Sequence, residues 1–486
     1  MKYLPRIEWE FLQKEKKISF IEKYSLNLDS INEMYLRRNE KYEILLEISG
    51  NASYNNIEEI NKITGKIDFF IETRFEIFNC HACEKINSSI SFPENKYDVT
   101  FKVQNINRNN KKYQGNEKVF IKEWYINSTR DGLIFNRGTK FNVQKEFIKI
   151  RDIPKNQELN IVEEYPPNSS LDSLFLNLNT FSVLLQKVPQ IFGPDWSDNL
   201  GIEYQKELNI PSDNIREKLV EFISFLMGRY LIKIGETHYD EKWNIIEDFV
   251  QTPNIASKID LKQICVQQDF NCINLYGEFL ELNIEGKLSL LIIEYLNELE
   301  LDLPHIIHQL LISMTLPVEA EIVMIGACLD KLTENWIHSS RSEHNGKLIE
   351  KDIFDELMGN YIEDIKDTFE DYPEVLKKIE NSFQASGRQK VDFFLKELEL
   401  EIGDVEDDAR SYRNKPAHGH KLDEEKLFKL MYLTAVYRSL LNRIILKILN
   451  YQEYIDLTSW RVLPINEKLS EENYKTYVQI LRENTK

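Results

Sequence analysis

Residues 423–450 read DEEKLFKLMYLTAVYRSLLNRIILKILN, and their apolar side chains recur every three or four positions. This spacing is sustained over roughly seven turns and predicts a long helix with one face in a hydrophobic core. Asp423 is the expected N-cap, and Glu424 and Glu425 suit the positive end of the helix dipole. The apolar positions are Leu427, Leu430, Met431, Tyr437, Leu440, Leu441, Ile444, Ile445, Ile448 and Leu449. The segment therefore predicts a helical C-terminal domain.

A short polar break separates this helix from residues 413–418, which read RNKPAH. Pro416 interrupts the preceding helix, so Arg413 is expected near a helix end and His418 in or just after the turn. An arginine guanidinium such as that of Arg413 can bind phosphate oxygens and stays charged, whereas a histidine such as His418 can take up and return a proton near neutral pH. These are the minimal groups for cleaving RNA without a metal. The histidine would deprotonate a ribose 2'-hydroxyl, and the arginine would neutralise the charge that builds on phosphorus.

Two other Arg–His pairs have comparable spacing, so spacing alone carries little weight. Arg74 and His81 lie in a stretch that reads as strand, and we interpret this pair as a chance match. His420 also follows Arg413, but a solvated loop position explains this second histidine. The setting ahead of a long helix therefore singles out Arg413 and His418.

From Pro304 onward the chain has the periodicity of consecutive helices, including an apolar stripe after Pro317. Further helices are expected at residues 352–365, 372–383, 388–400 and 470–483. With the helix from Asp423 they predict an up-and-down bundle of about four or five helices.

The C-terminal part of the chain resembles a known family. An Arg, a polar residue and then a His, between two helices of an all-α C-terminal domain, is similar to the signature of HEPN domains. The lead-in from Leu316-Pro317-Val318-Glu319 to Leu329-Asp330-Lys331-Leu332 is similar to the subgroup in ApeA-type phage-defence proteins. In those proteins a β-rich N-terminal region precedes the HEPN domain. The resemblance covers roughly residues 310–450 and is only architectural before them.

The resemblance implies a metal-independent endoribonuclease without a cofactor, acting in prokaryotic anti-phage defence by abortive infection. His418 would be general base and then acid, and Arg413 would hold the scissile phosphate. Asn414, Lys415 and His420 would bind or orient the substrate. The partner would be RNA, with tRNA among the candidate substrates. HEPN sites are completed by two protomers, which implies a homodimer through the C-terminal bundle.

Residues 1–165 read as a β-rich sensing or regulatory domain, so the fold class is expected to be α+β. Short strand patterns recur, and a hairpin is expected around Asp131-Gly132. The basic, Asn-rich residues 105–116 are expected to form a loop. A phage-derived trigger at this N-terminal half is the expected regulatory partner.

Residues 166–303 read as a mixed α/β continuation of the N-terminal half, and residues 304–486 as the nuclease domain. The proline-rich residues 166–170 favour a linker. Ser212 and Asp213 are expected to start a helix, with strands after it and another helix near residues 288–299.

The net charge of −19 disfavours a broad surface for coating nucleic acid, and instead fits a local positive site on an acidic body. The acidic residues 397–408, just before the RNKPAH motif, are interpreted as a solvated face. No apolar run reaches the length of a membrane span, and five cysteines favour a reducing cytoplasm over a disulfide framework.

Several alternative sites are weaker on the sequence alone. Cys80 and Cys83 have the spacing of half a zinc site without a second matching pair, so thiols in a core or on a surface are preferred. His305 and His308 share a helix face and are interpreted as core or interface residues. Asp330 could hold Arg413, but an ordinary surface acid is preferred. Phosphate-binding loops, GxSxG elbows and HExxH motifs are missing.

Two rival functions stay open. In the first, the bundle is a non-catalytic dimerisation or RNA-binding module and the protein works as a sensor. In the second, the chain is the toxin half of a toxin–antitoxin pair.

Overall fold

The computed structural model describes residues 12, 15–28, 30–91, 94–128, 137–144, 146–151, 158–161, 170–188, 198–205, 210–253, 272–273, 284–359, 361–413 and 423–484. The chain divides into two compact units. Unit 1 contains Met1–Phe270 and Leu275–Ile292, and unit 2 contains Asn271–Asn274 and Ile293–Lys486. The three domains expected from the sequence, residues 1–165, 166–303 and 304–486, stay a prediction.

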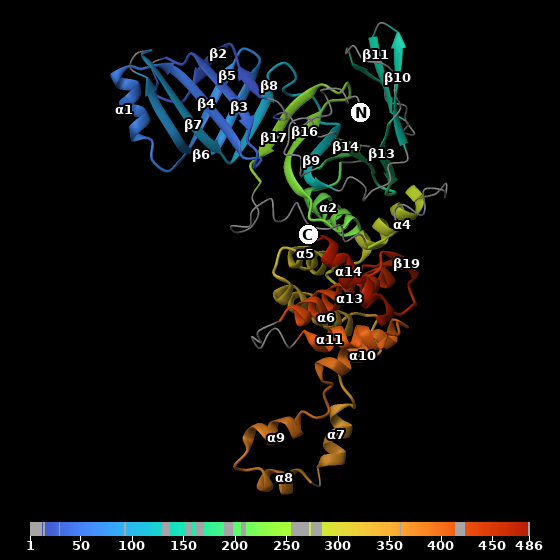
Figure 1. Ribbon diagram of the computed structural model, residues 1–486. Coiled ribbons are helices and arrows are strands. Elements are labelled where there is room, and N and C mark those ends of the chain that lie inside the picture. The colour runs from blue at the N-terminus through green and yellow to red at the C-terminus, as the bar shows by residue number, and fades with distance from the viewer. Residues whose placement is uncertain are drawn as a thin grey trace. The chain divides into compact units, whose positions relative to one another are not determined.

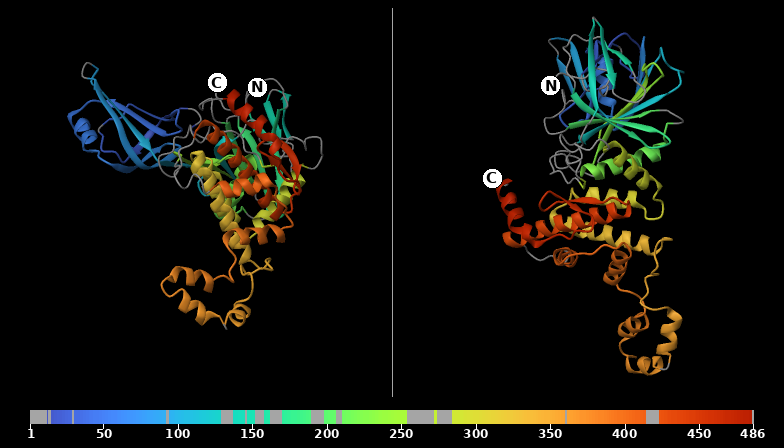
Figure 2. Two further views of the ribbon diagram at one scale, coloured as in Figure 1. Left: turned by 60° about the horizontal axis from the view of Figure 1, so that its bottom comes forward. Right: turned by 90° about the vertical axis from the view of Figure 1, so that its right-hand side faces the viewer.

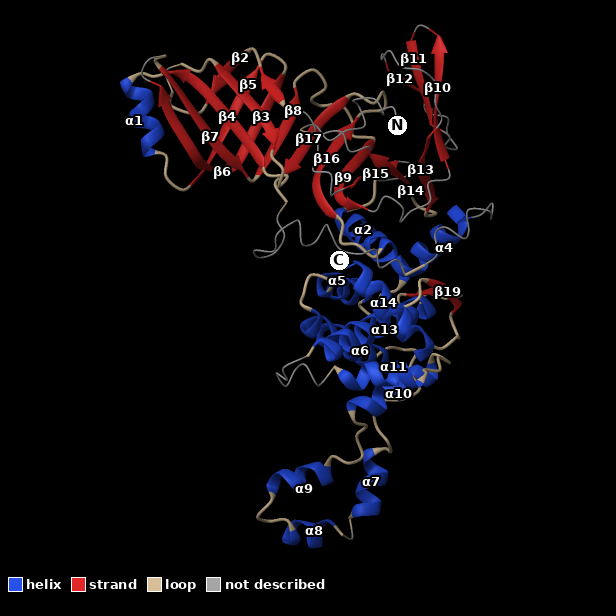
Figure 3. Ribbon diagram, in the orientation of Figure 1, coloured by secondary structure: helices blue, strands red, loops and turns tan. Residues whose placement is uncertain are grey.

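Unit 1 is built mainly from antiparallel strands, whereas the described part of unit 2 is mainly helical (Figure 3). The α+β class expected from the sequence is therefore confirmed. The strands of unit 1 are β1 Lys16–Ile18, β2 Ile21–Tyr24, β3 Glu33–Arg38, β4 Ile44–Asn51, β5 Lys66–Thr73, β6 Glu76–Ser91, β7 Lys96–Val103, β8 Asn105–Asn110, β9 Phe120–Ser128, β10 Arg137–Gln144, β11 Glu146–Arg151, β12 Glu158–Ile161, β13 Ser170–Asn177, β14 Ser182–Val188, β15 Asp198–Gln205, β16 Ile232–Tyr239 and β17 Ile245–Gln251. Its described helices are α1 Tyr54–Lys62, α2 Asp213–Met227 and the first part of α4 Ile284–Asn297.

The first strands pair around one core in the order β1-β3-β4-β7-β6-β5-β2. The ladder between β5 and β6 shifts register beside Ala82, whose φ of 49° marks a bulge. Strict alternation would put Cys80 and Cys83 on opposite faces, because they are three residues apart. The bulge turns both thiols into the core instead.

The remaining strands continue from β6 in the order β8-β17-β16-β9-β15-β14-β13-β10-β11-β12. The loop expected at residues 105–116 is wrong in its first half, since β8 is hydrogen-bonded to β6 and to β17. Ile106 is fully buried there, and Arg108 pairs with Glu76 and Asp248. Pairing with two neighbouring strands, together with the buried Ile106, therefore makes this segment a strand in spite of its polar composition. The hairpin expected around Asp131-Gly132 lies outside the described residues, and so do residues 166–169 of the linker expected at 166–170, whereas Ser170 is the first residue of β13.

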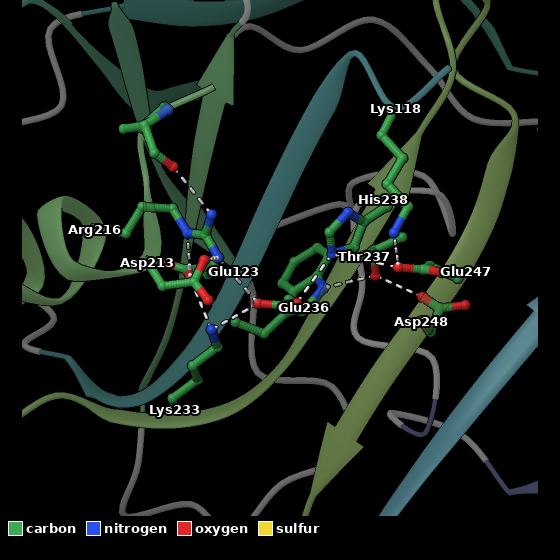
Figure 4. Close-up of polar contacts among 12 residues, drawn as sticks. Lys118, Glu123, Asp213, Arg216, Lys233, Glu236, Thr237, His238, Glu247 and Asp248 are labelled. Atoms are coloured by element: carbon green, nitrogen blue, oxygen red, sulfur yellow. Dashed lines mark hydrogen bonds and ion pairs between the residues drawn. The ribbon is translucent and has the colours of Figure 1, made fainter. Parts of the chain in front are cut away.

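Helix α2 is attached to the sheet through a buried carboxylate on the central strand β9 (Figure 4). The Glu123 side chain accepts hydrogen bonds from Tyr204 Oη at 2.8 Å, Arg216 Nε at 3.1 Å and Lys233 Nζ at 2.6 Å. Lys233 also reaches Glu236 Oε2 at 2.7 Å. We call Glu123, Arg216, Lys233 and Glu236 the Glu123 cluster. Its two cations balance its two carboxylates, so it stabilises the contact between α2, β9 and β16.

The described helices and strands of unit 2 are the end of α4, α5 Leu303–Ser313, α6 Val318–Ile337, α7 Lys351–Met358, α8 Ile362–Thr368, α9 Pro373–Glu380, α10 Gly387–Glu397, α11 Asp404–Tyr412, α13 Glu424–Ile448, β18 Glu453–Asp456, β19 Arg461–Pro464, η3 Glu471–Asn473 and α14 Tyr474–Asn484 (Figure 1). Helix α13 packs against α6, α11 and α14, and α6 packs against α5 and α10. The single helix expected at 352–365 is wrong, because α7 ends at Met358 and α8 begins at Ile362. The β18–β19 hairpin was not expected from the sequence.

Helix α13 confirms the long helix expected from the sequence, and Asp423 is its N-cap, accepting from Lys426 N at 2.9 Å. Its core face also contains two buried arginines that the apolar pattern concealed. Arg443 Nη1 lies 2.6 Å from Glu406 Oε1 of α11, and both side chains are fully buried. Arg438 Nη2 lies 2.5 Å from Glu321 Oε1 of α6. Across the described ranges, no helix is long and apolar enough to cross a membrane.

Candidate active site

Arg413 is the C-cap residue of α11, at the helix end where the sequence placed it. Asn414, Lys415, His418 and His420 lie outside the described residues. The surroundings of Arg413 therefore define the part of the expected site that the structure describes.

Two side chains from other helices hold the Arg413 guanidinium. Arg413 Nη1 lies 2.9 Å from Oδ2 of Asp330 on α6, and the guanidinium also hydrogen-bonds the Tyr437 hydroxyl on α13. Half-burial disfavours the charged arginine, yet the pKa of Arg413 is raised because Tyr437 and Asp330 outweigh that penalty. Burial raises the pKa of Tyr437 to about 12, so its hydroxyl stays neutral near pH 7. Asp330 is therefore the charged partner, and the preference for an ordinary surface acid at this position was wrong.

Gly326, one turn before Asp330 on α6, makes room for this arrangement. An added Cβ at this position would lie 2.6 Å from Arg413 Cδ and 2.7 Å from Arg413 Nη1. Such contacts are too short, so a side chain would push the guanidinium away. An isolated glycine inside a helical pattern is the sequence signal that could have revealed this packing.

Arg413 lines a pocket of about 170 Å³ together with residues of α6, α10, α11 and α13. Two more arginines line it, and both are paired with carboxylates. Arg388 Nη2 lies 2.5 Å from Asp407 Oδ2, and Arg410 Nη2 lies 3.0 Å from Asp392 Oδ1. The pocket is thus rich in guanidinium groups whose carboxylate partners occupy positions that phosphate oxygens could take.

Sequence reasoning missed Gly326, Arg388, Arg410 and the polar role of Tyr437. Tyr437 was read only as part of the apolar stripe of the long helix. Arg388 and Arg410 come from neighbouring helices, and their convergence depends on how α10 and α11 pack. No local pattern in the sequence records that packing.

The acidic residues 397–408 do not form a simple solvated face. Glu397 Oε1 accepts the backbone N–H groups of Glu343 and His344 at 2.9 and 3.0 Å. Glu406 is buried against Arg443, and Asp407 pairs with Arg388 beside the pocket. These three carboxylates therefore have structural partners, and the solvated-face interpretation is wrong for them.

The weaker candidate sites offer less chemistry. Burial raises the pKa of the Cys80 thiol well above its usual value and that of Cys83 to about 12, which disfavours the thiolate that binds zinc. Among the described residues, no group of three or more His, Cys, Asp or Glu side chains could hold a metal ion. His305 on α5 is exposed and His308 is partly buried, so His305 is not a core residue.

His238, which follows the Glu123 cluster on β16, is a buried histidine with a defined partner (Figure 4). Its Nε2 lies 3.0 Å from Glu236 Oε1, and its Nδ1 has no hydrogen-bond partner within the described part of the chain. The cluster is internally neutralised and lies within the sheet. It therefore has the properties of a structural ion network.

Comparisons of the chain with protein-family models, with curated proteins and with solved structures found no match. The HEPN resemblance accordingly rests on the residues of this sequence and stands as a proposal.

Proposed function

We propose that this chain is a metal-independent endoribonuclease of the HEPN type, acting in the prokaryotic cytoplasm in defence against phage. The observation that carries the proposal is the guanidinium of Arg413, fixed by Asp330 and Tyr437 at the edge of an arginine-lined pocket. It immediately precedes the segment that contains His418. A positioned cation next to a titratable base is what cleavage through the ribose 2'-hydroxyl requires.

In the proposed reaction, His418 takes the proton from the 2'-hydroxyl while the 2'-oxygen attacks phosphorus. The bond from phosphorus to the 5'-oxygen then breaks, and His418 returns its proton to that leaving oxygen. Arg413 exchanges Asp330 for the phosphate and stabilises the added negative charge in the transition state. The products carry a 2',3'-cyclic phosphate and a 5'-hydroxyl, and neither redox chemistry nor a cofactor is involved.

The proposal includes a homodimer through the C-terminal bundle, in which two copies of the motif share one cleft. It assigns the strand-rich unit 1 a sensing role, with a phage-derived trigger. The carboxylates paired with Arg388, Arg410 and Arg413 compete with phosphate for the guanidiniums. This competition would keep cleavage low until RNA is presented correctly, in keeping with the net charge of −19.

The test is incubation of purified protein with total cellular RNA in excess EDTA, followed by analysis of the RNA ends. We expect discrete cuts with cyclic-phosphate ends from the wild type, and none from His418→Ala or Arg413→Ala. His81→Ala is the matched control, because His81 also follows an arginine at comparable spacing but lies on β6. Arg37→Ala controls for the loss of an arginine that is paired with a carboxylate, that of Glu47, far from Arg413 in the sequence. Both controls should cleave like the wild type.

The paired state of the pocket arginines favours one alternative, a non-catalytic RNA-binding or dimerisation module. Under that alternative neither the wild type nor His418→Ala would cleave RNA, whether purified RNA or extract from infected cells is used. Cleavage in the extract by the wild type alone would instead show that the enzyme needs a trigger. Cleavage by all variants alike would identify a contaminating nuclease and refute the assigned site.

A further inference from the structure

Residues 345–385, between α6 and α10, form a segment that we call the helical insert. Its two ends are joined by backbone hydrogen bonds, from Leu348 N to Phe383 O at 2.7 Å and from Ala385 N to Gly346 O at 3.0 Å. Beyond this stem the chain forms α7, α8 and α9, which stand apart from the other helices of unit 2 (Figures 1 and 2, orange). The insert is therefore a separate excursion from the bundle.

The helical insert has almost no core of its own. Its helices are 8, 7 and 8 residues long, and none has a side-chain N-cap hydrogen bond. Phe354 is the buried residue of α7, with its ring centroid 5.5 Å from that of Phe383, and no residue of α8 or α9 is buried. Isolated helices this short are marginal in water, so the insert lacks the packing that normally stabilises them.

Instead of packing inward, large apolar side chains of the insert face solvent. Ile353, Leu357, Tyr361 and Tyr372 are 51–63% exposed. Leu348, Ile349 and Val375 are exposed as well. Single exposed apolar residues are ordinary, but a concentration of them within one short segment marks a site for a protein partner.

The charge of the helical insert limits which classes of molecule could bind to it. Residues 345–385 contain eleven acidic and five basic residues, a net charge of −6. A phosphate backbone is repelled by such a surface, and so is a second copy of the insert in a chain whose own net charge is −19. A partner surface that is basic and also carries apolar side chains would complement both the acidic charge and the exposed apolar side chains of the insert.

We propose that the helical insert is the docking surface for a basic, amphipathic helical segment of another protein. The apolar side chains of that segment cover Ile353, Leu357 and Tyr372, and its lysines and arginines pair with the surrounding carboxylates. Burial of these side chains supplies the packing that α7, α8 and α9 lack. Docking therefore orders the insert as well as binding the partner.

The test uses the full chain and a synthetic amphipathic lysine–leucine peptide of about 18 residues, which can form a helix when bound. A peptide with glutamate at every lysine position is the charge control. We expect only the lysine peptide to bind, with affinity that falls as salt rises. Hydrogen exchange should show new amide protection within residues 348–376, and this readout does not depend on any variant.

Ile353→Ser combined with Leu357→Ser and Tyr372→Ser should weaken binding about tenfold or more, since anchor side chains carry most of an interface's affinity. Leu290→Ser combined with Leu299→Ser is the matched control, because these leucines are 64% and 77% exposed outside the insert. The control should bind like the wild type.

Three results would overturn the proposal. The first is equal peptide binding by the insert variant and the wild type, or amide protection confined to other residues. The second is self-association of the wild type that the insert variant abolishes, which would identify a second copy as the occupant. The third is binding of single-stranded RNA that the insert variant weakens. None of these measurements uses RNA cleavage, so they are independent of the proposed ribonuclease activity.

Discussion

At position 326 the lack of a side chain allows the Arg413 guanidinium to lie against α6. We expect Gly326→Ala to stabilise the helix by up to about 1 kcal/mol, because alanine is the better helix former. The same Cβ displaces the guanidinium, and displacement of a catalytic group by about 1 Å can cost roughly 100-fold in rate. The variant should therefore unfold at the same or a higher temperature and, under the proposed function, cleave RNA about 100-fold more slowly than the wild type.

Gly387→Ala is the matched control for this substitution, because a Cβ at Gly387 on α10 meets no atom within 4 Å. Gly387 lines the same pocket as Arg413, but an added Cβ there displaces no group, so Gly387→Ala should leave the melting temperature nearly unchanged and slow cleavage far less than Gly326→Ala does. Full activity of Gly326→Ala would show that the observed position of Arg413 is not the one used in cleavage.

Among single residues, the sequence predicted Arg413 at a helix end, and the structure agrees. It did not predict that Asp330 and Tyr437 hold the guanidinium, because these residues come from α6 and α13. A motif contains residues that are close in sequence, whereas the surroundings of Arg413 are formed by the packing of separate helices. The positions of Asn414, Lys415, His418 and His420 stay predictions.

At the scale of elements, the ion pair between Arg443 and Glu406 joins α13 to α11, the helix that ends at Arg413. Burial raises the pKa of Glu406, and the nearby Arg443 only partly offsets this effect. Arg443→Met leaves that carboxylate buried without its cation, which should cost about 3–5 kcal/mol in the free energy of unfolding of unit 2. Urea denaturation followed by circular dichroism at the helix band measures the loss.

Combining Arg443→Met with Glu406→Leu should recover most of that stability, because a buried ion pair and an apolar pair of similar volume are often nearly equivalent. Lys426→Met is the control on the same helix, since its pair with Asp423 is exposed and contributes little. A small loss in Arg443→Met would show that Glu406 is neutral, or that water reaches it.

Periodicity predicted α13 and its N-cap well, because an apolar stripe and a capping carboxylate are local features. The same pattern could not show that Arg438 and Arg443 are buried, since their partners Glu321 and Glu406 lie in other helices. The single helix expected at residues 352–365 failed for a different reason. Gly359 is the C-cap of α7, and because glycine is a poor helix former the chain ends one helix there and begins the next at Ile362.

For the whole molecule, the Glu123 cluster predicts how stability changes with pH. Burial alone would raise the pKa of Glu236, but the hydrogen bond from His238 and the charge of Lys233 outweigh burial and lower it far below 4.5. A carboxyl group with a lowered folded-state pKa contributes stability above its unfolded pKa and loses it as pH falls toward the folded pKa. The free energy of unfolding of unit 1 should therefore decrease progressively below about pH 4.5.

Glu236→Gln removes the titrating group, so its unfolding free energy should be lower at pH 7 and should change less between about pH 5 and pH 3. Glu33→Gln is the control: the pKa of Glu33 is also lowered, but its ion pair with Lys17 is exposed to solvent and therefore contributes little stability. Its pH profile should follow the wild type. Parallel profiles for Glu236→Gln and the wild type would exclude Glu236 as a source of the acid sensitivity.

The order of strands in unit 1 could not be read from the chain. Alternation identifies which side chains face a core, but it does not say which edges pair. Strand β9 is buried throughout and pairs with β15 and β16, which follow it only after long intervening segments. The Glu123 cluster depends on pairings between strands that are distant in sequence. No local sequence motif could therefore have predicted it.

The hydrogen-bonded stem of the helical insert has a consequence for how this chain could have changed over time. Because the chain leaves and re-enters the bundle at one point, between Gly346 and Ala385, the length of the excursion does not affect the path of α6 or α10. Such a module can be acquired, exchanged or lost as a unit while the geometry around Arg413 is preserved. Under the two proposals made above, the docking surface of the insert can thus vary independently of the ribonuclease site.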